Sequence, residues 1–241
     1  MARPEDARLD PELQPVLGRL EAAVGMVAVI SGRDREFLQD RVQRHVAGVV
    51  TIGSYGLEMP PELSRTGLPA RFPAQQVRAR LEIARRELEA SLVAGSRLEV
   101  KPWGLALHYR GAGPGFDDAA ARTLAEGVAE RHDLVVQLGR LVVELKPRDA
   151  VDKGWALAMV AAHFQPSAVV FVGDDLGDVP AWDATRQLGE RIPSLAVAIA
   201  SPELPRGALA SCNLVLSDRA LLAQFLDQLA DEAEAGGEAP A

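Results

Sequence analysis

Short apolar runs alternate with longer segments of helical periodicity near both ends of the chain. The predicted strands are 26–30, 48–52, 168–172, 195–199 and 213–216. The predicted helices cover 10–24, 34–46, 153–164, 181–188 and 220–230. The runs 26–30 and 168–172 have the length and β-branched composition of strands buried on both faces of a sheet. This alternation predicts an α/β fold with a doubly wound, parallel, Rossmann-like core.

Between Glu62 and Lys146 the pattern changes. Two helical segments, near 77–92 and 117–132, accompany short strands with period-two alternation at 97–101, 105–110, 134–138 and 141–145. Such alternation indicates a sheet that is open to water on one face. We therefore expect an inserted α+β cap domain over residues 62–146 and a core domain over residues 1–61 and 147–241.

Composition excludes several classes of protein. The chain has 241 residues, 48% of them hydrophobic, and a net charge of −8, which argues against a nucleic-acid partner. No apolar run approaches the roughly 20 residues of a membrane span, and the first residues lack a signal-peptide pattern, so we expect a cytoplasmic protein without a membrane partner. The single cysteine, Cys212, excludes an intrachain disulfide. The acidic, Ala- and Gly-rich tail, 231–241, is expected to fray.

Three carboxylates gather after the strand 168–172. Asp174 and Asp175 follow its carboxyl end, where open α/β sheets bind ligands, and Asp178 lies four residues after Asp174 in the first turn of a helix. Mg²⁺ prefers oxygen ligands and is usually held by one or two carboxylates, so this spacing suits a magnesium site. The alternative is an acidic loop that only caps the following helix.

Two further positions suit a phosphate. Ser31, Gly32 and Arg33 follow the strand 26–30, where a hydroxyl and the free N–H groups of a new helix can hold a phosphate oxygen. The alternative is that Ser31 is an ordinary helix N-cap. Lys153 begins the helix 153–164, where a cation opposes the helix macrodipole. A bound phosphate would compensate for that placement, and the alternative is a lysine that points into solvent.

Two strands of the cap share a pattern of one acid and one base on the same face. They contain Glu99 with Lys101 and Glu144 with Lys146, and His108 and Arg110 extend this polar set. Neighbouring acceptors and donors suit a polyol, because every hydroxyl both donates and accepts hydrogen bonds. The alternative is a pair of solvated salt bridges, each worth roughly 0 to 1 kcal/mol.

Together these motifs resemble those of a known superfamily. The ordered set that resembles the haloacid dehalogenase superfamily of phosphatases is Ser31-Gly32-Arg33, then Lys153-Gly154, then residues 173–178 (GDDLGD), with a cap before Lys153. Within it, the segments similar to trehalose-6-phosphate phosphatases are Glu99-x-Lys101, His108-Tyr109-Arg110 and Glu144-x-Lys146-Pro147. The resemblance covers nearly the whole chain.

The resemblance implies roles for these residues. Asp174 and Asp178 would hold Mg²⁺ with Asp175 beside them, and Ser31 and Lys153 would act in catalysis on the transferring phosphoryl group. The phosphate-binding set would be Ser31, Gly32, Arg33 and Lys153. The substrate trehalose 6-phosphate would meet the cap through Glu99, Lys101, His108, Arg110, Glu144 and Lys146. A trehalose-phosphate synthase would be the pathway partner.

The chain departs from the family pattern in three places. Residues 176–179 lack the Thr and Glu that are frequent there, and Tyr55 stands where a His is common. The first motif of the superfamily, an Asp-x-Asp pair that ends the first core strand and supplies the nucleophile, is absent, whereas residues 3–8 resemble the segment that follows it. We therefore expect a natural protein that is longer at its N-terminus. The alternatives are a non-catalytic sugar-phosphate-binding or regulatory protein, and a phosphatase for another sugar phosphate such as sucrose or glucosylglycerol phosphate.

Overall fold

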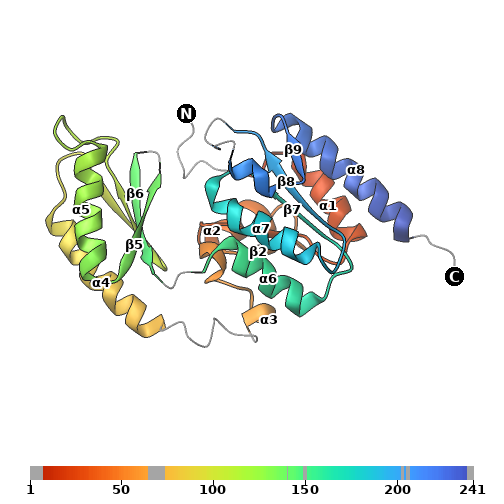
Figure 1. The fold of residues 1–241 in the computed structure, drawn as a ribbon, viewed down its shortest axis with the longest axis horizontal. Helices are drawn as coiled ribbons and strands as arrows, with labels where there is room; N and C mark the ends of the chain where they lie inside the picture. Colours follow the sequence, from red (N-terminus) through yellow and green to blue (C-terminus); the bar gives the residue numbers. More distant parts are fainter. Residues whose placement is uncertain are drawn as a thin grey trace. The chain divides into compact units, whose positions relative to one another are not determined.

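A computed structural model describes residues 8–64, 74–139, 141–148, 151–201, 204 and 207–237. The chain divides into two compact units (Figure 1). The first unit combines Met1–Gly67 with Val151–Ala241, and the second is Leu68–Ala150. No helix in the described part of the chain has both the length and the apolar character that a membrane crossing requires.

The described residues of the first unit form two parallel sheets. In one, β1 (Ala28–Ile30) pairs with β2 (Val50–Ile52). The other has the order β7-β8-β9, from β7 (Val169–Gly173) through β8 (Ser194–Ile199) to β9 (Leu214–Leu216). All of these pairings are parallel, as the expected α/β class requires.

Helices cover both faces of these sheets. They are α1 (Leu13–Ala23), α2 (Arg35–Leu38) with a π-helical turn (Gln39–Gln43), α3 (Pro61–Ser64), α6 (Lys153–Phe164), α7 (Val179–Leu188) and α8 (Ala220–Gly237). On one face, Trp155 of α6 packs with Ile30 and Ile52, and α6 also packs against α7. On the other face, α8 packs against both sheets. Its Leu226 packs with Val29 of β1, and its Phe225 packs with Val172 of β7.

The inner strands β1 and β7 each pair along one edge only, as far as the structure describes the chain. Val170 in β7 is 36% exposed, and Ala28 in β1 is also exposed. The prediction that both strands are buried on both faces is therefore wrong for them. The physical reason is that a strand at a sheet edge has no neighbouring strand to shield its side chains.

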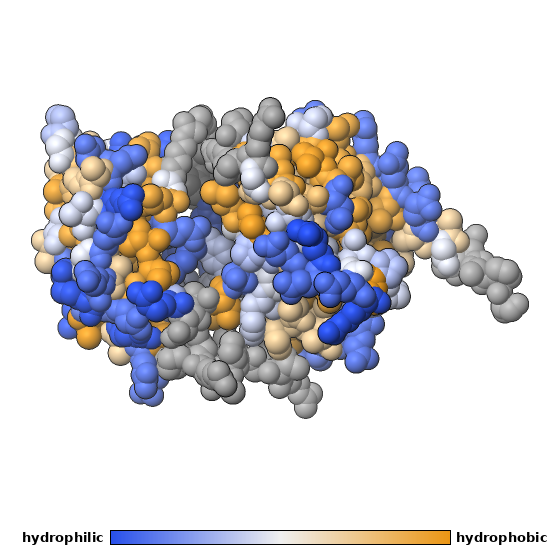
Figure 2. Space-filling model, in the orientation of Figure 1, coloured by the Kyte–Doolittle hydropathy of each residue, from blue (hydrophilic) through white to orange (hydrophobic). Residues whose placement is uncertain are grey.

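The last helix is longer than expected. α8 continues to Gly237 instead of fraying after residue 230, and its outer half presents a hydrophilic surface (Figure 2). Arg19 of α1 holds this half, because its guanidinium donates to Asp227 at 2.5 Å, Asp231 at 2.6 Å and Glu234 at 2.9 Å. These acids raise the pKa of Arg19, and residues 238–241 lie outside the described part of the chain.

In the second unit, the residues that the structure describes form an antiparallel sheet and two helices. Its elements are α4 (Ala74–Ala90), β3 (Arg97–Lys101), β4 (Gly104–His108), α5 (Asp118–Arg131), β5 (Leu134–Gly139) and β6 (Val142–Pro147), and the strand order is β3-β4-β6-β5. Apolar residues of α4 and α5 are buried with Leu105, Leu107, Val143 and Leu145 of the sheet. The opposite face carries the alternating polar residues.

One cap residue lies off the strand on which it was predicted. β4 ends at His108, so Arg110 falls in the following turn, where its side chain is exposed. The Tyr109 N–H still donates to the carbonyl of Leu141 at 3.2 Å, in register with the β4-β6 pairing, but the Ala112 N–H then bonds back to the Tyr109 carbonyl at 3.0 Å and closes the turn that contains Arg110. The expectation that Arg110 shares a strand face with His108 is therefore wrong.

Candidate functional site

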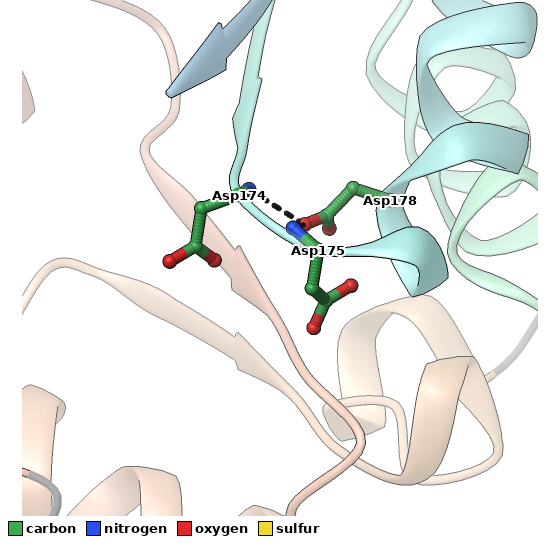
Figure 3. A group of neighbouring side chains, drawn as sticks. All are labelled: Asp174, Asp175 and Asp178. Carbon is green, nitrogen blue, oxygen red and sulfur yellow. Dashed lines mark hydrogen bonds between the residues drawn. The ribbon is translucent and has the colours of Figure 1, made fainter. Parts of the chain in front are cut away.

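Three aspartates lie at the carboxyl end of β7. Asp174 and Asp175 follow the strand, and Asp178 ends a 3₁₀ turn (Leu176–Asp178) directly before α7. One carboxylate oxygen from each residue can be chosen so that all three atoms lie within 4.8 Å of one another. Figure 3 shows the carboxylates of Asp174 and Asp175 extending to one side of the loop, while that of Asp178 turns toward the backbone of the other two.

Asp178 organises this loop. Its side chain is 5% exposed, and its Oδ2 accepts the N–H groups of Asp174 at 2.9 Å and Asp175 at 3.0 Å (Figure 3). Its Oδ1 accepts from Nζ of Lys153 at 2.6 Å. Burial raises the pKa of Asp178, although the Lys153 ammonium acts in the opposite direction. The contacts therefore fix both carboxylate oxygens in place.

Lys153 points into the protein and not into solvent. It is the first residue of α6, and its side chain is 10% exposed. Its Nζ also lies 3.8 Å from Oδ1 of Asp175. The helix itself is capped by Asp152, which accepts the N–H of Trp155 at 2.8 Å. The solvent-exposed alternative is therefore wrong, and the carboxylates compensate for a cation at the helix N-terminus.

The loop after β1 is held by backbone contacts. Ser31 N–H donates to the carbonyl of Ile52 at 3.0 Å, and its Oγ accepts the N–H of Arg33 at 3.2 Å. α2 is capped by Asp34, which accepts from Phe37 N–H at 2.7 Å, so the alternative that Ser31 is the N-cap is wrong.

The start of α2 offers fewer free donors than the sequence suggested. Glu58 accepts the N–H of Arg35 at 2.8 Å, and Asp34 occupies that of Phe37. Glu58 also accepts from the hydroxyl of Ser54, so it ties the loop after β2 to this helix. Two of the N–H groups expected to hold a phosphate oxygen are thus taken by carboxylates.

Tyr55 lies between the two loops. Its N–H donates to the carbonyl of Ser31 at 2.8 Å, and its backbone is left-handed, with φ of 59°. A Cβ placed on Gly32 would lie 2.5 Å from the Tyr55 ring, and one on Gly177 would lie 3.6 Å from it. The aromatic ring therefore links the end of the β1-β2 sheet to the acidic loop after β7, and the ring leaves no room for a side chain at Gly32.

One charged residue at the site was not selected from the sequence. Arg219, in the segment that starts α8, donates from its guanidinium to Oδ2 of Asp174. A signal for it existed, because a cation at a helix N-terminus opposes the macrodipole, which is the argument that selected Lys153. Within the described part of the chain, the structure thus brings Lys153 and Arg219 to the three carboxylates.

The cap residues form a separate set on the polar face of β3-β4-β6. Lys101 pairs with Glu144 across strands, Lys146 lies 3.2 Å from the same carboxylate, and Nε2 of His108 lies 2.7 Å from Glu99. Burial alone would raise the pKa of Glu144, but the two ammonium groups lower it. The side chain of Glu144 is 19% exposed, so these pairs are not the fully solvated bridges of the alternative. Arg110 lies outside this network, in the turn after β4.

Two solved structures show which fold the chain has. The C-terminal domain of C. albicans trehalose-6-phosphate phosphatase aligns with a TM-score of 0.70 at 21% identity, over 96% of this chain and 87% of that one. A haloacid dehalogenase-like hydrolase from Bacteroides thetaiotaomicron aligns with a TM-score of 0.64 at 12% identity, over 95% of both chains. The fold is that of haloacid dehalogenase-like proteins.

Sequence comparison identifies the family. The trehalose-phosphatase family model matches residues 1–205, so the chain belongs to the trehalose-phosphatase family, and the resemblance drawn from the motifs is confirmed. Trehalose-phosphate phosphatase of Mycolicibacterium paratuberculosis is 33% identical over 240 residues, which is 94% of this chain and 59% of that protein. The Mycobacterium tuberculosis phosphatase is 34% identical over 239 residues, 57% of its length. The chain therefore spans well under two thirds of these relatives.

A third relative is larger. An uncharacterized glycosyl hydrolase of Mycobacterium tuberculosis is 37% identical over 202 residues, which is 78% of this chain and 14% of that protein. The region of similarity to this chain is thus a small part of a much longer polypeptide there.

Proposed function

We propose that this chain is the phosphatase portion of a protein that hydrolyses trehalose 6-phosphate to trehalose and phosphate with Mg²⁺. The observation that carries the proposal is the buried Lys153 ammonium, 2.6 Å from Asp178, within an acidic loop at the carboxyl end of a parallel strand. A fixed cation beside clustered carboxylates suits a reaction in which a metal and an ammonium together offset phosphate charge.

The acidic loop has the donor chemistry of a magnesium site. The loop offers carboxylate oxygens, and Mg²⁺ prefers oxygen ligands. Asp174 and Asp178 would hold the ion with Asp175 beside them. Each carboxylate oxygen has two lone pairs, so the bonds that Asp178 already accepts leave acceptor capacity. When bound, Mg²⁺ would supply positive charge at the transferring phosphoryl group.

The protein's own groups would bind and orient the phosphate. The Lys153 ammonium is held by Asp178 and would lie against one phosphoryl oxygen, and the Ser31 hydroxyl would donate to another. Gly32 and Arg33 would complete the phosphate-binding loop, whose backbone is fixed by the bond from Tyr55 N–H to the Ser31 carbonyl. This fixed geometry lowers the entropy lost when the substrate is oriented.

The nucleophile belongs to a strand that we propose between β1 and β7. Both strands have an inner edge without a strand partner in the described part of the chain, and α8 packs against both sheets. The unpaired N–H and C=O groups of such an edge can pair with another strand, and neither edge carries a charge or proline that would protect it. A parallel strand encoded upstream of residue 1 would pair both edges and end at the site with an Asp-x-Asp pair.

The chemistry would then proceed through a covalent intermediate. The first aspartate of that pair would attack phosphorus in line, the P–O bond to the sugar would break, and the second aspartate would protonate the departing sugar oxygen. Water would then hydrolyse the aspartyl-phosphate, giving inorganic phosphate and restoring the carboxylate. The chain's contribution to both steps is the electrostatic clamp of Lys153 and the acidic loop.

The cap would select the sugar. Its network of Glu99, Lys101, His108, Glu144 and Lys146 offers carboxylate acceptors beside ammonium donors, which matches the alternating donor and acceptor needs of sugar hydroxyls. Arg110 would act from the turn after β4 and not from the strand face.

A second candidate is a non-catalytic sugar-phosphate-binding or regulatory protein. It is favoured by the absence of the Asp-x-Asp pair from the 241 residues. The C-terminal domain of the Candida albicans trehalose synthase regulatory protein also shares the fold, with a TM-score of 0.57 at 14% identity. In that case a trehalose-phosphate synthase would be a binding partner and not only a pathway neighbour.

Phosphate release decides between these candidates. The 241-residue chain and a version extended by its upstream reading frame are each assayed on trehalose 6-phosphate, sucrose 6-phosphate and glucosylglycerol phosphate, with Lys153→Met as the inactive control. We expect release only from the extended version and fastest with trehalose 6-phosphate. An upstream stop codon before any Asp-x-Asp strand, with trehalose 6-phosphate binding but no turnover, would establish the regulatory candidate.

A further inference from the structure

Arg219 forms an ion pair with Asp174 although the two residues are 45 positions apart. The segment that carries it is fixed: Asp218 Oδ1 accepts the N–H of Leu221 at 3.2 Å, and the Arg219 carbonyl accepts the N–H of Leu222 at 3.1 Å. Its side chain is 80% exposed, whereas that of Asp174 is 37% exposed. The guanidinium thus reaches the acidic loop from the solvent side.

The two cations at the loop differ in how they are held. Lys153 is buried and bound to Asp178, whose Oδ2 is also occupied by two backbone N–H groups. Arg219 is bound to Asp174, which is the partly exposed carboxylate. A divalent cation entering from solvent therefore meets Asp174 with Arg219 in place, while the Lys153–Asp178 pair stays intact beneath it.

We propose that Arg219 is a tethered counter-cation, which neutralises Asp174 when no divalent cation is bound and competes with the cation for that carboxylate. The inference rests on the magnesium site of the proposed function. Without Arg219, three neighbouring carboxylates would share one ammonium, and their mutual repulsion would disfavour the metal-free loop. Because the arginine is exposed, it can move into solvent at small cost, so it weakens cation binding without blocking it.

The test measures Mg²⁺ affinity directly. Magnesium chloride is titrated into the 241-residue chain by calorimetry at constant ionic strength, and the melting temperature is recorded without and with saturating Mg²⁺. The variants are Arg219→Ala, Arg219→Lys and the double variant Arg219→Ala with Asp174→Asn. The matched control is Arg191→Ala, which removes the same charge beyond the far end of α7, about 15 Å of helix from Asp178.

We expect Arg219→Ala to bind Mg²⁺ about three- to tenfold more tightly than Arg191→Ala, because a like charge next to the ion is removed. Its melting temperature should fall without Mg²⁺ and recover when Mg²⁺ saturates the site. Arg219→Lys should restore wild-type affinity, and the double variant should lose the gain, because Asp174 is the shared ligand.

Each contrary result has a distinct meaning. If the wild type binds Mg²⁺ and the Mg²⁺ affinity of Arg219→Ala is within twofold of that of Arg191→Ala, the proposed role of Arg219 is wrong. The magnesium site itself is then still supported. An Arg219→Ala affinity weaker than wild type also overturns it, since the arginine would then support binding. No Mg²⁺ binding by any of the proteins overturns the magnesium site and this inference together.

Discussion

Replacing Lys153 with methionine tests whether the Lys153–Asp178 pair holds the acidic loop. The substitution keeps the apolar stem of the side chain at the start of α6 and removes the ammonium that lies 2.6 Å from Asp178. Asp178 would then be a carboxylate with a side chain only 5% exposed and no cation on its Oδ1. Its remaining partners are the N–H groups of Asp174 and Asp175.

The expected cost is large for one substitution. Removing one partner of a buried ion pair typically costs about 3 to 5 kcal/mol, because the other charge stays buried without compensation. The two N–H bonds to Oδ2 remain, and Asp178 can lose its buried negative charge by binding a proton. We therefore expect the free energy of unfolding to fall by about 2 to 4 kcal/mol near neutral pH. Asp178→Asn in the Lys153→Met background should recover part of it.

The pH dependence follows from the same contacts. Burial already raises the pKa of Asp178 above its ordinary 3.8, and removing the ammonium raises it further. The folded variant then binds the proton more tightly than the unfolded chain, so its stability falls as pH rises through the raised pKa. The deficit relative to wild type should therefore be smaller at about pH 5 than at about pH 8.

Urea unfolding of the wild type, both single variants and the double variant gives the coupling free energy between the two residues. We expect a coupling of about 2 to 3 kcal/mol at neutral pH. A coupling below about 0.5 kcal/mol, or a Lys153→Met deficit that grows as pH falls, would refute the assignment of the pair as the support of the loop.

Three further predictions concern the same sites. Asp174→Asn should abolish the rise in melting temperature that Mg²⁺ produces in the wild type, and an equal rise in both proteins would contradict the metal assignment. In an active, extended protein, Glu144→Ala should raise KM for trehalose 6-phosphate about 5- to 100-fold and leave KM for p-nitrophenyl phosphate unchanged, because only the sugar meets the cap network; equal losses on both substrates would indicate misfolding instead. Gly32→Ala should destabilise the chain by about 1 to 3 kcal/mol in urea unfolding, because its Cβ would lie 2.5 Å from the Tyr55 ring, whereas Gly18→Ala in α1, with no atom within 4 Å, should be neutral or stabilising.

Local sequence patterns were sufficient to predict the elements whose ends depend on neighbouring residues. The helix predicted over 153–164 has these bounds in the structure, because the Asp152 cap and the left-handed Gln165 that end it act within one turn. The strand 97–101 and the polar face of the cap also follow from period-two alternation, which depends only on backbone geometry. The family could also be predicted from the sequence, because its motifs are short and follow a fixed order along the chain.

Pairing between distant segments was decided by tertiary structure alone. Alternation placed Glu144 and Lys101 on polar faces, but only the strand order β3-β4-β6 joins them across strands. The extension of α8 depends on Arg19 in α1, and the exposure of Val170 depends on the open edge of β7. Arg219 reaches Asp174 only because β9 brings the start of α8 to the carboxyl end of the sheet. Sequence encodes local periodicity and capping, whereas which charges meet is set by how the elements pack.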